Sequence, residues 1–398
     1  MQDNRQALGQ YMTPDIVANL VARNIPSGVT QILDLAAGDC SLLRAAQKRR
    51  SDLELFGYEI DSDMHRRARQ CLPSAKVSLV NGLTGRLHKD FDTQNQIAVV
   101  GNPPFTEMVP TDALRKILFK AFPGLTTKLG GRRSEVYFLA RSLLIAKVSN
   151  GTVAILMPIS FADGDIYSQY RSELMKNYAI RKVIEIPENA FIATEARTVL
   201  LIIDTSLNNT KQIDIGRFDV TTEKVSRIYK GQLHAGDRLD ARYYDGRTKF
   251  DAHALQLKDV GVTVTRGVYS HKEAKTMALG AIHTSDLARA RNGKMSLNQN
   301  NGMHHRDTDL LDNAMAYPGD ILLPRTGSRV IWSPVIVSDG SAPITDHVFR
   351  IRVPSASLEA VKNAFMHPNF NAWLKCTSKG VCATVLTKRE LLTMPLFS

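Results

Sequence analysis

The sequence predicts an α/β protein, with a doubly wound, mainly parallel sheet followed by a second, β-rich domain. From about residue 30 to 205, short apolar runs alternate with amphipathic stretches, as in repeated strand–helix units. The polar stretch TSLNNTKQ (205–212) then reads as a linker, and beyond it the apolar runs become shorter, more β-branched and separated by turns. Because 398 residues exceed one ordinary core, we place two domains at 1–212 and 213–398.

A helix is expected ahead of the first strand. Thr13 is predicted as its N-cap and Pro14 as its first helical residue, with apolar residues at helical spacing behind them. Its exposed amides could receive a carboxylate or phosphate. A capped helix without a ligand is an equally good interpretation.

The remaining elements of the first domain follow in order. Helices are expected over stretches that include 64–71, 136–147 and 167–177. Strands are expected at 31–35, 53–58, 76–80, 97–100, 152–157, 182–186 and 198–203.

The composition indicates which cellular compartment and which kinds of partner to expect. No apolar run reaches the roughly 18–20 residues of a membrane span, and the polar N-terminus lacks a signal peptide core. The four cysteines form no C-x-x-C pair, so we expect no metal site and a cytoplasmic location. The formal charge of +12 favours a polyanionic partner, although a merely basic soluble protein is an open alternative.

The first two strands end in residues suited to a nucleoside. Asp34 is followed by a loop of small residues that includes Ala36 and Gly38, where the backbone can approach a ligand. One strand later, Glu59 and Ile60 follow, and an acid there accepts hydrogen bonds from ribose hydroxyls. A solvated strand end is the alternative for Glu59. The loop is not G-x-G-x-x-G, which argues against a dinucleotide.

The next two strands end in side-chain amides. Asn81, followed by Gly82, is placed to hydrogen-bond an adenine ring. The fourth strand delivers Asn102-Pro103-Pro104-Phe105, a loop that two prolines make stiff. Open α/β sheets place their ligands at such strand ends. A rigid turn without function is the alternative.

These residues resemble a known family, the S-adenosylmethionine-dependent DNA methyltransferases that modify adenine N6, in the gamma arrangement. The resemblance covers about residues 8–205 and implies a Rossmann-like methyltransferase sheet. It rests on LGQYMTP (8–14), DLAAGDC (34–40), YEID (58–61) and, most specifically, GNPPF (101–105).

The resemblance also implies roles for these residues. S-adenosylmethionine is the expected cofactor, and Asn102, Pro103, Pro104 and Phe105 the expected catalytic residues, with Phe105 stacking on a flipped-out adenine. Phe191 is a candidate for a second aromatic residue that packs on the flipped base, and a core residue is the alternative. Tyr137 and Phe138 are expected in the core. The expected cofactor contacts are Tyr11, Met12, Thr13, Pro14, Asp34, Ala36, Gly38, Glu59, Ile60, Asn81, Gly82 and Asn102.

Two positions depart from the family pattern. Asp39-Cys40 stands where a second glycine or small residue is usual, and Asn81 stands near a usual acid. They leave a non-catalytic DNA-binding protein as an alternative. Methylation of RNA or of a protein glutamine is a further alternative, because the same loop can hold any planar amino or amide nitrogen. Cytosine N4 is less expected, since that chemistry more often goes with serine in place of Asn102.

The second domain resembles the target-recognition domains of Type I restriction specificity subunits. The resemblance lies in HAGDRLDARYYD (234–245), PGDILLPRTGS (318–328) and the stretch 374–396. It implies double-stranded DNA as partner, with Arg266, Arg325 and Arg329 as candidate contacts; solvated loop charges are the alternative. The polar stretch 283–312 is a further candidate for a DNA-contacting loop.

The motif order bears on partners. Because the first motif begins at residue 8, we expect no N-terminal nuclease, so restriction would need a separate restriction or defence subunit. One recognition domain suggests one contiguous or asymmetric site.

Overall fold

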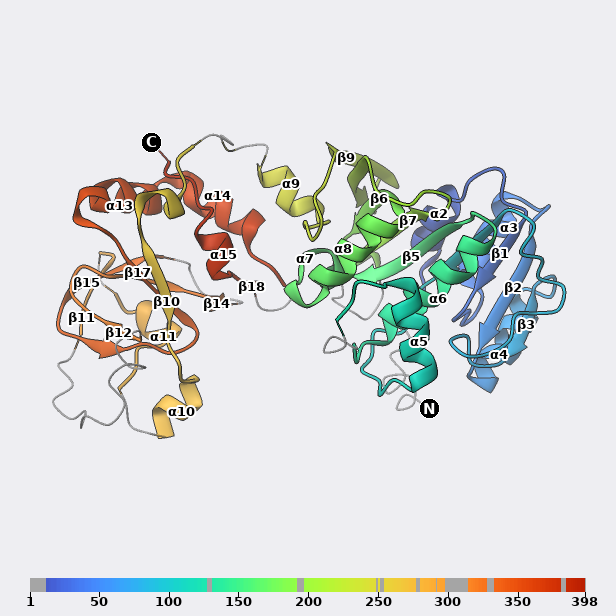
Figure 1. Cartoon of the computed structure of the whole chain (residues 1–398), viewed down its shortest axis with the longest axis horizontal. Helices are drawn as coiled ribbons and strands as arrows, with labels where there is room; N and C mark the ends of the chain where they lie inside the picture. Colours follow the sequence, from blue (N-terminus) through green and yellow to red (C-terminus); the bar gives the residue numbers. More distant parts are fainter. Residues whose placement is uncertain are drawn as a thin grey trace. The chain divides into compact units, whose positions relative to one another are not determined.

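The computed structural model divides the chain into two compact units, residues 1–241 and 242–398. It describes residues 12–126, 131–191, 197–247, 250, 254–276, 280–290, 292–297, 314–327, 333–380 and 384–397. Figure 1 shows the course of the chain through both units.

The first unit is built on one sheet of nine strands. These are β1 (Gln31–Asp34), β2 (Glu54–Glu59), β3 (Lys76–Leu79), β4 (Ile97–Gly101), β5 (Thr152–Pro158), β6 (Ala179–Ile186), β7 (Thr198–Asp204), β8 (Ile213–Asp219) and β9 (Lys224–Gly231). They lie in the order β3-β2-β1-β4-β5-β7-β6-β8-β9. The first five are mutually parallel, and β7 runs antiparallel to both β5 and β6. The predicted doubly wound, mainly parallel sheet is confirmed.

The domain boundary differs from the predicted one. Strands β8 and β9 follow residue 212, yet β8 pairs in parallel with β6 and β9 pairs with β8, so both extend the first sheet. The first unit therefore continues to Ala241. The short polar segment 205–212 connects two strands of one sheet.

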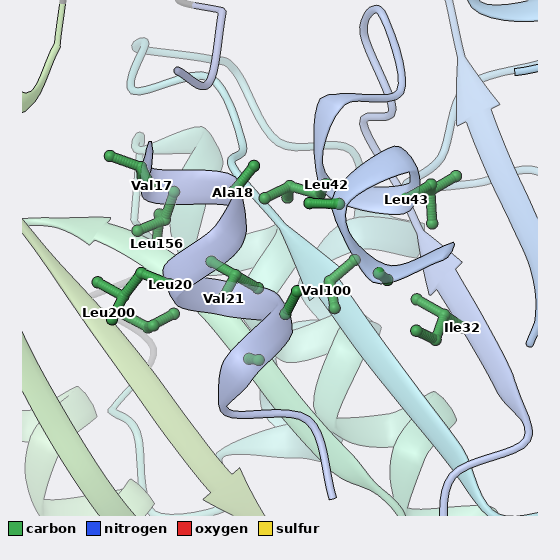
Figure 2. Close-up of a cluster of buried hydrophobic side chains, with 14 of the residues drawn as sticks. Val17, Ala18, Leu20, Val21, Ile32, Leu42, Leu43, Val100, Leu156 and Leu200 are labelled. Atoms are coloured by element: carbon green, nitrogen blue, oxygen red, sulfur yellow. The ribbon is translucent and has the colours of Figure 1, made fainter. Parts of the chain in front are cut away.

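Helices cover both faces of the sheet. Helix α6 packs on β4 and β5, and α8 packs on β6. In Figure 2, side chains of α2, including Val17 and Leu20, meet Leu156 of β5 and Leu200 of β7. The helices of this unit are α2 (Asp15–Arg23), α3 (Ser41–Arg49), α4 (Ser62–Cys71), α5 (Asp112–Ala121), α6 (Ser134–Val148), α7 (Ile159–Asp163) and α8 (Ser168–Asn177), with 3-10 turns at Asp165–Tyr167 and Glu188–Ala190.

The start of α2 corrects one prediction. Its N-cap is Pro14, whose carbonyl accepts from the amides of Val17 and Ala18, and no side chain caps it. Thr13 therefore is not the N-cap, and Pro14 is not the first helical residue. The Thr13 hydroxyl instead accepts a hydrogen bond from the side-chain amide of Asn102, 89 positions away.

The sheet order creates a site for a ligand. β1 pairs with β2 on one side and with β4 on the other, so successive strands are added to opposite edges of the sheet on the two sides of β1. A crevice opens at such a switch point, outside the carboxyl ends of the strands. The ends of β1, β2, β3 and β4 are where the sequence places its four candidate motifs.

The second unit contains a five-stranded sheet in the order β10-β17-β13-β15-β11 and two small two-stranded sheets, β12-β16 and β14-β18. Its strands are β10 (Thr263–Arg266), β11 (Lys294–Ser296), β12 (Met315–Ala316), β13 (Ile321–Pro324), β14 (Thr326–Gly327), β15 (Val335–Asp339), β16 (Ala342–Pro343), β17 (Val348–Arg352) and β18 (Thr384–Val385). Its helices are α9 (Ala241–Arg247, which begins at the boundary), α10 (His271–Thr276), α11 (Thr284–Leu287), α13 (Leu358–Met366), α14 (Pro368–Thr377) and α15 (Lys388–Leu391), with 3-10 turns at Leu257–Val260 and Ser355–Ser357. The prediction of a second, β-rich domain is confirmed.

Among the described residues, no helix is both long and apolar enough to cross a membrane.

Candidate active site at the carboxyl edge of the sheet

A pocket of about 420 Å³ lies where the sheet order reverses. Its size suits a nucleoside-sized ligand, since ligand pockets commonly enclose about 300–1,000 Å³. Its walls combine apolar side chains with a few polar groups. They comprise Met12, Leu35, Ala36, Gly38, Tyr58, Glu59, Ile60, Met64, Asn81, Gly82, Leu83, Asn102, Pro104, Thr106, Glu107, Met108, Ser134 and Phe138.

The loop after β1 forms the floor of this pocket. Gly38 adopts a positive φ of 55°, which glycine tolerates without strain. Cys40, a non-glycine residue, adopts a φ of 63° with its side chain fully buried. The departure at Asp39-Cys40 therefore keeps a turn that usually favours glycine. Asp39 contributes by accepting a hydrogen bond from the Ser41 amide at the start of α3.

Glu59, at the end of β2, is buried and held by backbone amides. One carboxylate oxygen accepts from Gly38 at 2.8 Å, and the other accepts from Ile60 and Asp61 at 2.9 and 2.8 Å. A carboxylate offers about four acceptor sites. Glu59 thus fixes the loop after β1 and retains capacity for a hydroxyl group in the pocket.

Asp34 lies beneath the loop and is 1% exposed. Its carboxylate accepts from the Ala36 amide at 2.9 Å. Burial raises the pKa of Asp34 to about 7, and the negative charges of Glu59 and Asp39 add to the effect. Asp34 is therefore a structural support of the loop that does not line the pocket.

The turn after β3 closes another side of the pocket. The Asn81 side-chain oxygen accepts from the Leu83 amide at 2.8 Å, which shapes the turn. A Cβ at Gly82 would lie 1.8 Å from the Leu35 carbonyl oxygen. Only glycine allows this close approach between the turn and the loop after β1.

Asn102 follows β4 and lines the same pocket. Its Nδ2 donates to the Thr13 hydroxyl at 3.0 Å, linking the loop after β4 to the segment before α2. Because the amide nitrogen faces Thr13, the hydrogen bond fixes the orientation of the whole amide, Oδ1 included. The segment before α2 and the loop after β4 are thus in direct contact.

The rest of the loop divides between burial and exposure. Pro103 is buried, Pro104 lines the pocket, and Phe105 is half-buried without lining it. The segment that follows pairs with the approach to α6: Met108 donates its amide to the Arg132 carbonyl at 2.6 Å.

The described residues of the predicted cofactor set separate into two groups. The residues that line the pocket are Met12, Ala36, Gly38, Glu59, Ile60, Asn81, Gly82 and Asn102. The residues that support it from behind or from the side are Thr13, Pro14 and Asp34. Tyr11 lies outside the described residues.

Phe191 belongs to the core. It is 8% exposed and packs into the hydrophobic cluster beneath α2 and α3, so the alternative of a core residue fits it. Tyr137, also expected in the core, is fully buried and donates its hydroxyl to the Gly131 carbonyl at 2.8 Å.

Phe138 corrects a prediction. The sequence predicts a core position for Phe138, but the residue is half-buried and lines the pocket. Other residues that line the pocket were not predicted as site residues; they include Ser134, Thr106, Glu107, Met108 and Met64.

The candidate DNA contacts lie in the second unit. Arg266 is exposed at the end of β10, and Arg325 is half-buried after β13. Burial lowers the pKa of Arg325, and the positive charge of Arg266 adds to the effect, so the two cations are close enough to interact. Arg325 also donates to the Asp346 carbonyl at 3.3 Å. Arg329 and most of the polar stretch 283–312 lie outside the described residues.

Among the described residues, no group of three or more His, Cys, Asp or Glu side chains is arranged to hold a metal ion.

The sheet order, with a pocket at its switch point, defines a Rossmann-like methyltransferase fold. A family model described as N-6 DNA Methylase matches residues 1–232, which is more than half of the 398-residue chain. The chain belongs to the N-6 DNA methylase family.

Solved structures give weaker similarities. The methyltransferase subunit of a type I restriction-modification system from Streptococcus thermophilus is 20% identical, with a TM-score of 0.45, and the match covers 61% of this chain and 54% of that one. The type IIG restriction endonuclease BpuSI is 13% identical, with a TM-score of 0.48, over 98% of this chain and 59% of that one. The M protein of the type I restriction enzyme EcoKI is 18% identical, with a TM-score of 0.39, over 54% and 50%. The chain thus spans about half to three fifths of the length of these structures.

Proposed function

We propose that this protein transfers a methyl group from S-adenosylmethionine to the N6 amino group of a flipped-out adenine in double-stranded DNA. The observation that carries the proposal is the position of Asn102: it borders the pocket that Glu59 also lines, and Thr13 fixes its amide. A group held by Glu59 and a base held by Asn102 would thus share one site.

The pocket suits the proposed cofactor. Glu59 would accept hydrogen bonds from the ribose hydroxyls, and Asn81 lies where the adenine ring would find a polar partner. Two apolar side chains at the rim, Ile60 and Met12, are 61% and 43% exposed and would cover apolar parts of the cofactor. When bound, S-adenosylmethionine supplies an electrophilic methyl group.

The residues of this chain would prepare the acceptor nitrogen. An adenine amino group is a poor nucleophile because its lone pair is delocalised into the ring. The Asn102 Oδ1 and the Pro103 carbonyl would accept hydrogen bonds from its two N–H groups and favour a more tetrahedral nitrogen, a preference that applies to the transition state. The stiff Asn-Pro-Pro loop keeps both acceptors in place without reorganisation.

Phe105 would stack on the extruded base. Adenine N6 cannot reach a buried pocket from inside a duplex, so the base must leave the stack. The half-buried ring of Phe105 follows directly after the pocket-lining Pro104. Its place next to the pocket wall along the chain supports this role.

The second unit is proposed as the target-recognition domain. The chain carries 51 Lys and Arg against 39 Asp and Glu, which favours a polyanion. Arg266 and Arg325 are the proposed contacts with phosphates or guanine edges. We further propose that the protein serves a restriction-modification or related defence system in the cytoplasm, with restriction assigned to a separate subunit.

The test is transfer of a labelled methyl group from S-adenosylmethionine to unmethylated bacterial DNA by wild type and by Asn102→Ala. We expect transfer by wild type and a loss of about 100-fold or more in the variant, the scale of removing one preorganised polar group from an active site. Equal transfer by both proteins would contradict the role of Asn102. Label in RNA or protein but not in DNA would contradict the substrate.

A further inference from the structure

Ser134, the first residue of α6, holds the catalytic loop from two sides. Its hydroxyl donates to the Pro104 carbonyl and accepts from the Thr106 amide at 3.1 Å. Its own amide donates to the Thr106 carbonyl at 2.9 Å. The side chain is 4% exposed, so these bonds compete little with water. The backbone directly after Asn102 and Pro103 is thereby fixed to the start of α6.

Arg141 holds the opposite side of the pocket from the same helix. Its two terminal guanidinium nitrogens donate to the carbonyls of Leu83 and Gly85, in the turn that Asn81 and Gly82 begin. Burial lowers the pKa of Arg141, although a guanidinium keeps its charge at neutral pH. Among the described residues, no carboxylate forms an ion pair with Arg141. Its hydrogen bonds therefore serve the turn.

The spacing of these two residues places them on one face of α6. Seven residues make almost two full helical turns, with a rise of roughly 10 Å. Phe138 lies between them and lines the pocket. The helix is also locked in place, because Val136, Leu139 and Leu143 are fully buried on its other faces.

We propose that α6 is a rigid helix that fixes the distance between the catalytic loop and the turn at residues 81–85. Ser134 and Arg141 are the positioning residues at its two ends. This inference rests on the proposed function, because it assigns the turn to the cofactor and the loop to the base. The two ends consequently control different quantities: Arg141 controls cofactor affinity, and Ser134 controls turnover.

Arg141 is tested by equilibrium binding. Arg141→Met removes both donors and keeps an unbranched side chain, whereas Arg141→Lys keeps the charge without the two-pronged geometry. Calorimetry would measure the dissociation constants of S-adenosylmethionine and S-adenosylhomocysteine. We expect about tenfold or weaker binding for Arg141→Met and an intermediate loss for Arg141→Lys, because bonds from a charged donor contribute strongly. Arg69→Met, at an exposed site on α4, is the matched control and should bind as wild type does.

The role of Ser134 is tested by measuring kcat and the cofactor dissociation constant separately. Ser134→Ala should lower kcat about tenfold or more while the cofactor dissociation constant stays within about twofold of wild type. Ser142→Ala, at a buried serine on the same helix, is the control for a general packing effect. Thermal unfolding of each variant reports whether the helix itself is disturbed.

The outcomes separate this inference from the proposed function. A wild-type protein that binds neither cofactor form contradicts the proposed function. If the wild-type protein binds the cofactor and the Arg141 variants bind it equally well, the proposed role of α6 is wrong. The inference is also overturned if Ser134→Ala and Arg141→Met change cofactor affinity by the same factor as each other and kcat by the same factor as each other.

Discussion

Thr13 is the residue whose role the structure changes most. The sequence favoured a helix cap, but its hydroxyl accepts the amide hydrogen bond of Asn102. Thr13→Val keeps the side-chain shape and removes that acceptor, so Asn102 can rotate its amide. We expect kcat for methyl transfer to fall about tenfold, measured at saturating DNA and cofactor.

Thr13→Ser supplies the control for this prediction, because it retains the hydroxyl and should keep most of the wild-type kcat. A Thr13→Val enzyme with wild-type kcat would show that Asn102 needs no such orientation.

Asp34 predicts a pH dependence of stability. Burial raises the pKa of its carboxyl to about 7 in the folded protein, whereas an unfolded chain has a value near about 4. The stability that this group contributes is therefore complete at low pH and is lost as the pH rises through about 7. Between pH 5.5 and 8.5 the loss is about 2 kcal/mol.

The variant Asp34→Asn tests this assignment, since an amide can still accept from Ala36 but carries no proton to lose. Urea unfolding at the two pH values should show a smaller decline for Asp34→Asn than for wild type. The same decline in both proteins would exclude Asp34 as its source.

Single residues were predictable where they belong to contiguous motifs. Glu59, Asn81 and Asn102 could be found because each follows an apolar strand, and strand ends meet at one edge of a parallel sheet. Ser134 and Arg141 could not, because their partners lie about 30 and nearly 60 positions away and no local pattern marks the contact. Phe138 was missed for a related reason: a helix buried on nearly all faces has no amphipathic pattern to show which side meets the pocket.

At the scale of elements, the turn after β3 depends on one glycine. Gly82→Ala would place a Cβ 1.8 Å from the Leu35 carbonyl oxygen, so the turn or the loop after β1 must move. Because both line the pocket, we expect about tenfold weaker cofactor binding, with a lower thermal unfolding midpoint.

Gly28→Ala is the matched control for this effect. Its added Cβ meets only the far end of the flexible Gln96 side chain, which can move away. Calorimetry that found equal cofactor affinity for Gly82→Ala and wild type would show that the close approach at Gly82 is not needed for binding.

The elements of the first unit were largely predictable, since all seven expected strands are present with small shifts at their ends. The error lay in β8 and β9. Strand β9 contains no buried residue, so it lacks the apolar run that marks the buried parallel strands before it. A sheet-edge strand carries little information about which sheet it joins.

In the molecule as a whole, the proposed function assigns catalysis to the first unit and DNA recognition to the second. Arg266→Ala and Arg325→Ala should each weaken DNA binding and reduce the slope of log K against log salt by about 1. The dissociation constant for S-adenosylmethionine should stay unchanged, because both residues lie in the second unit.

Arg389→Ala removes one exposed charge from the same unit and is the control. An equal loss of DNA affinity in all three variants would point to nonspecific charge in place of a defined contact. Unchanged binding in Arg266→Ala and Arg325→Ala would remove both residues from the DNA interface.

The atom proposed to receive the methyl group is N6 of adenine. The most direct measurement is mass spectrometry of the nucleosides of unmethylated DNA after incubation with wild-type protein and S-adenosylmethionine carrying a deuterated methyl group. We expect the heavy methyl group in N6-methyladenine alone. Its appearance in N4-methylcytosine, or in no nucleoside of DNA although the protein binds both the cofactor and DNA, would contradict the proposed function.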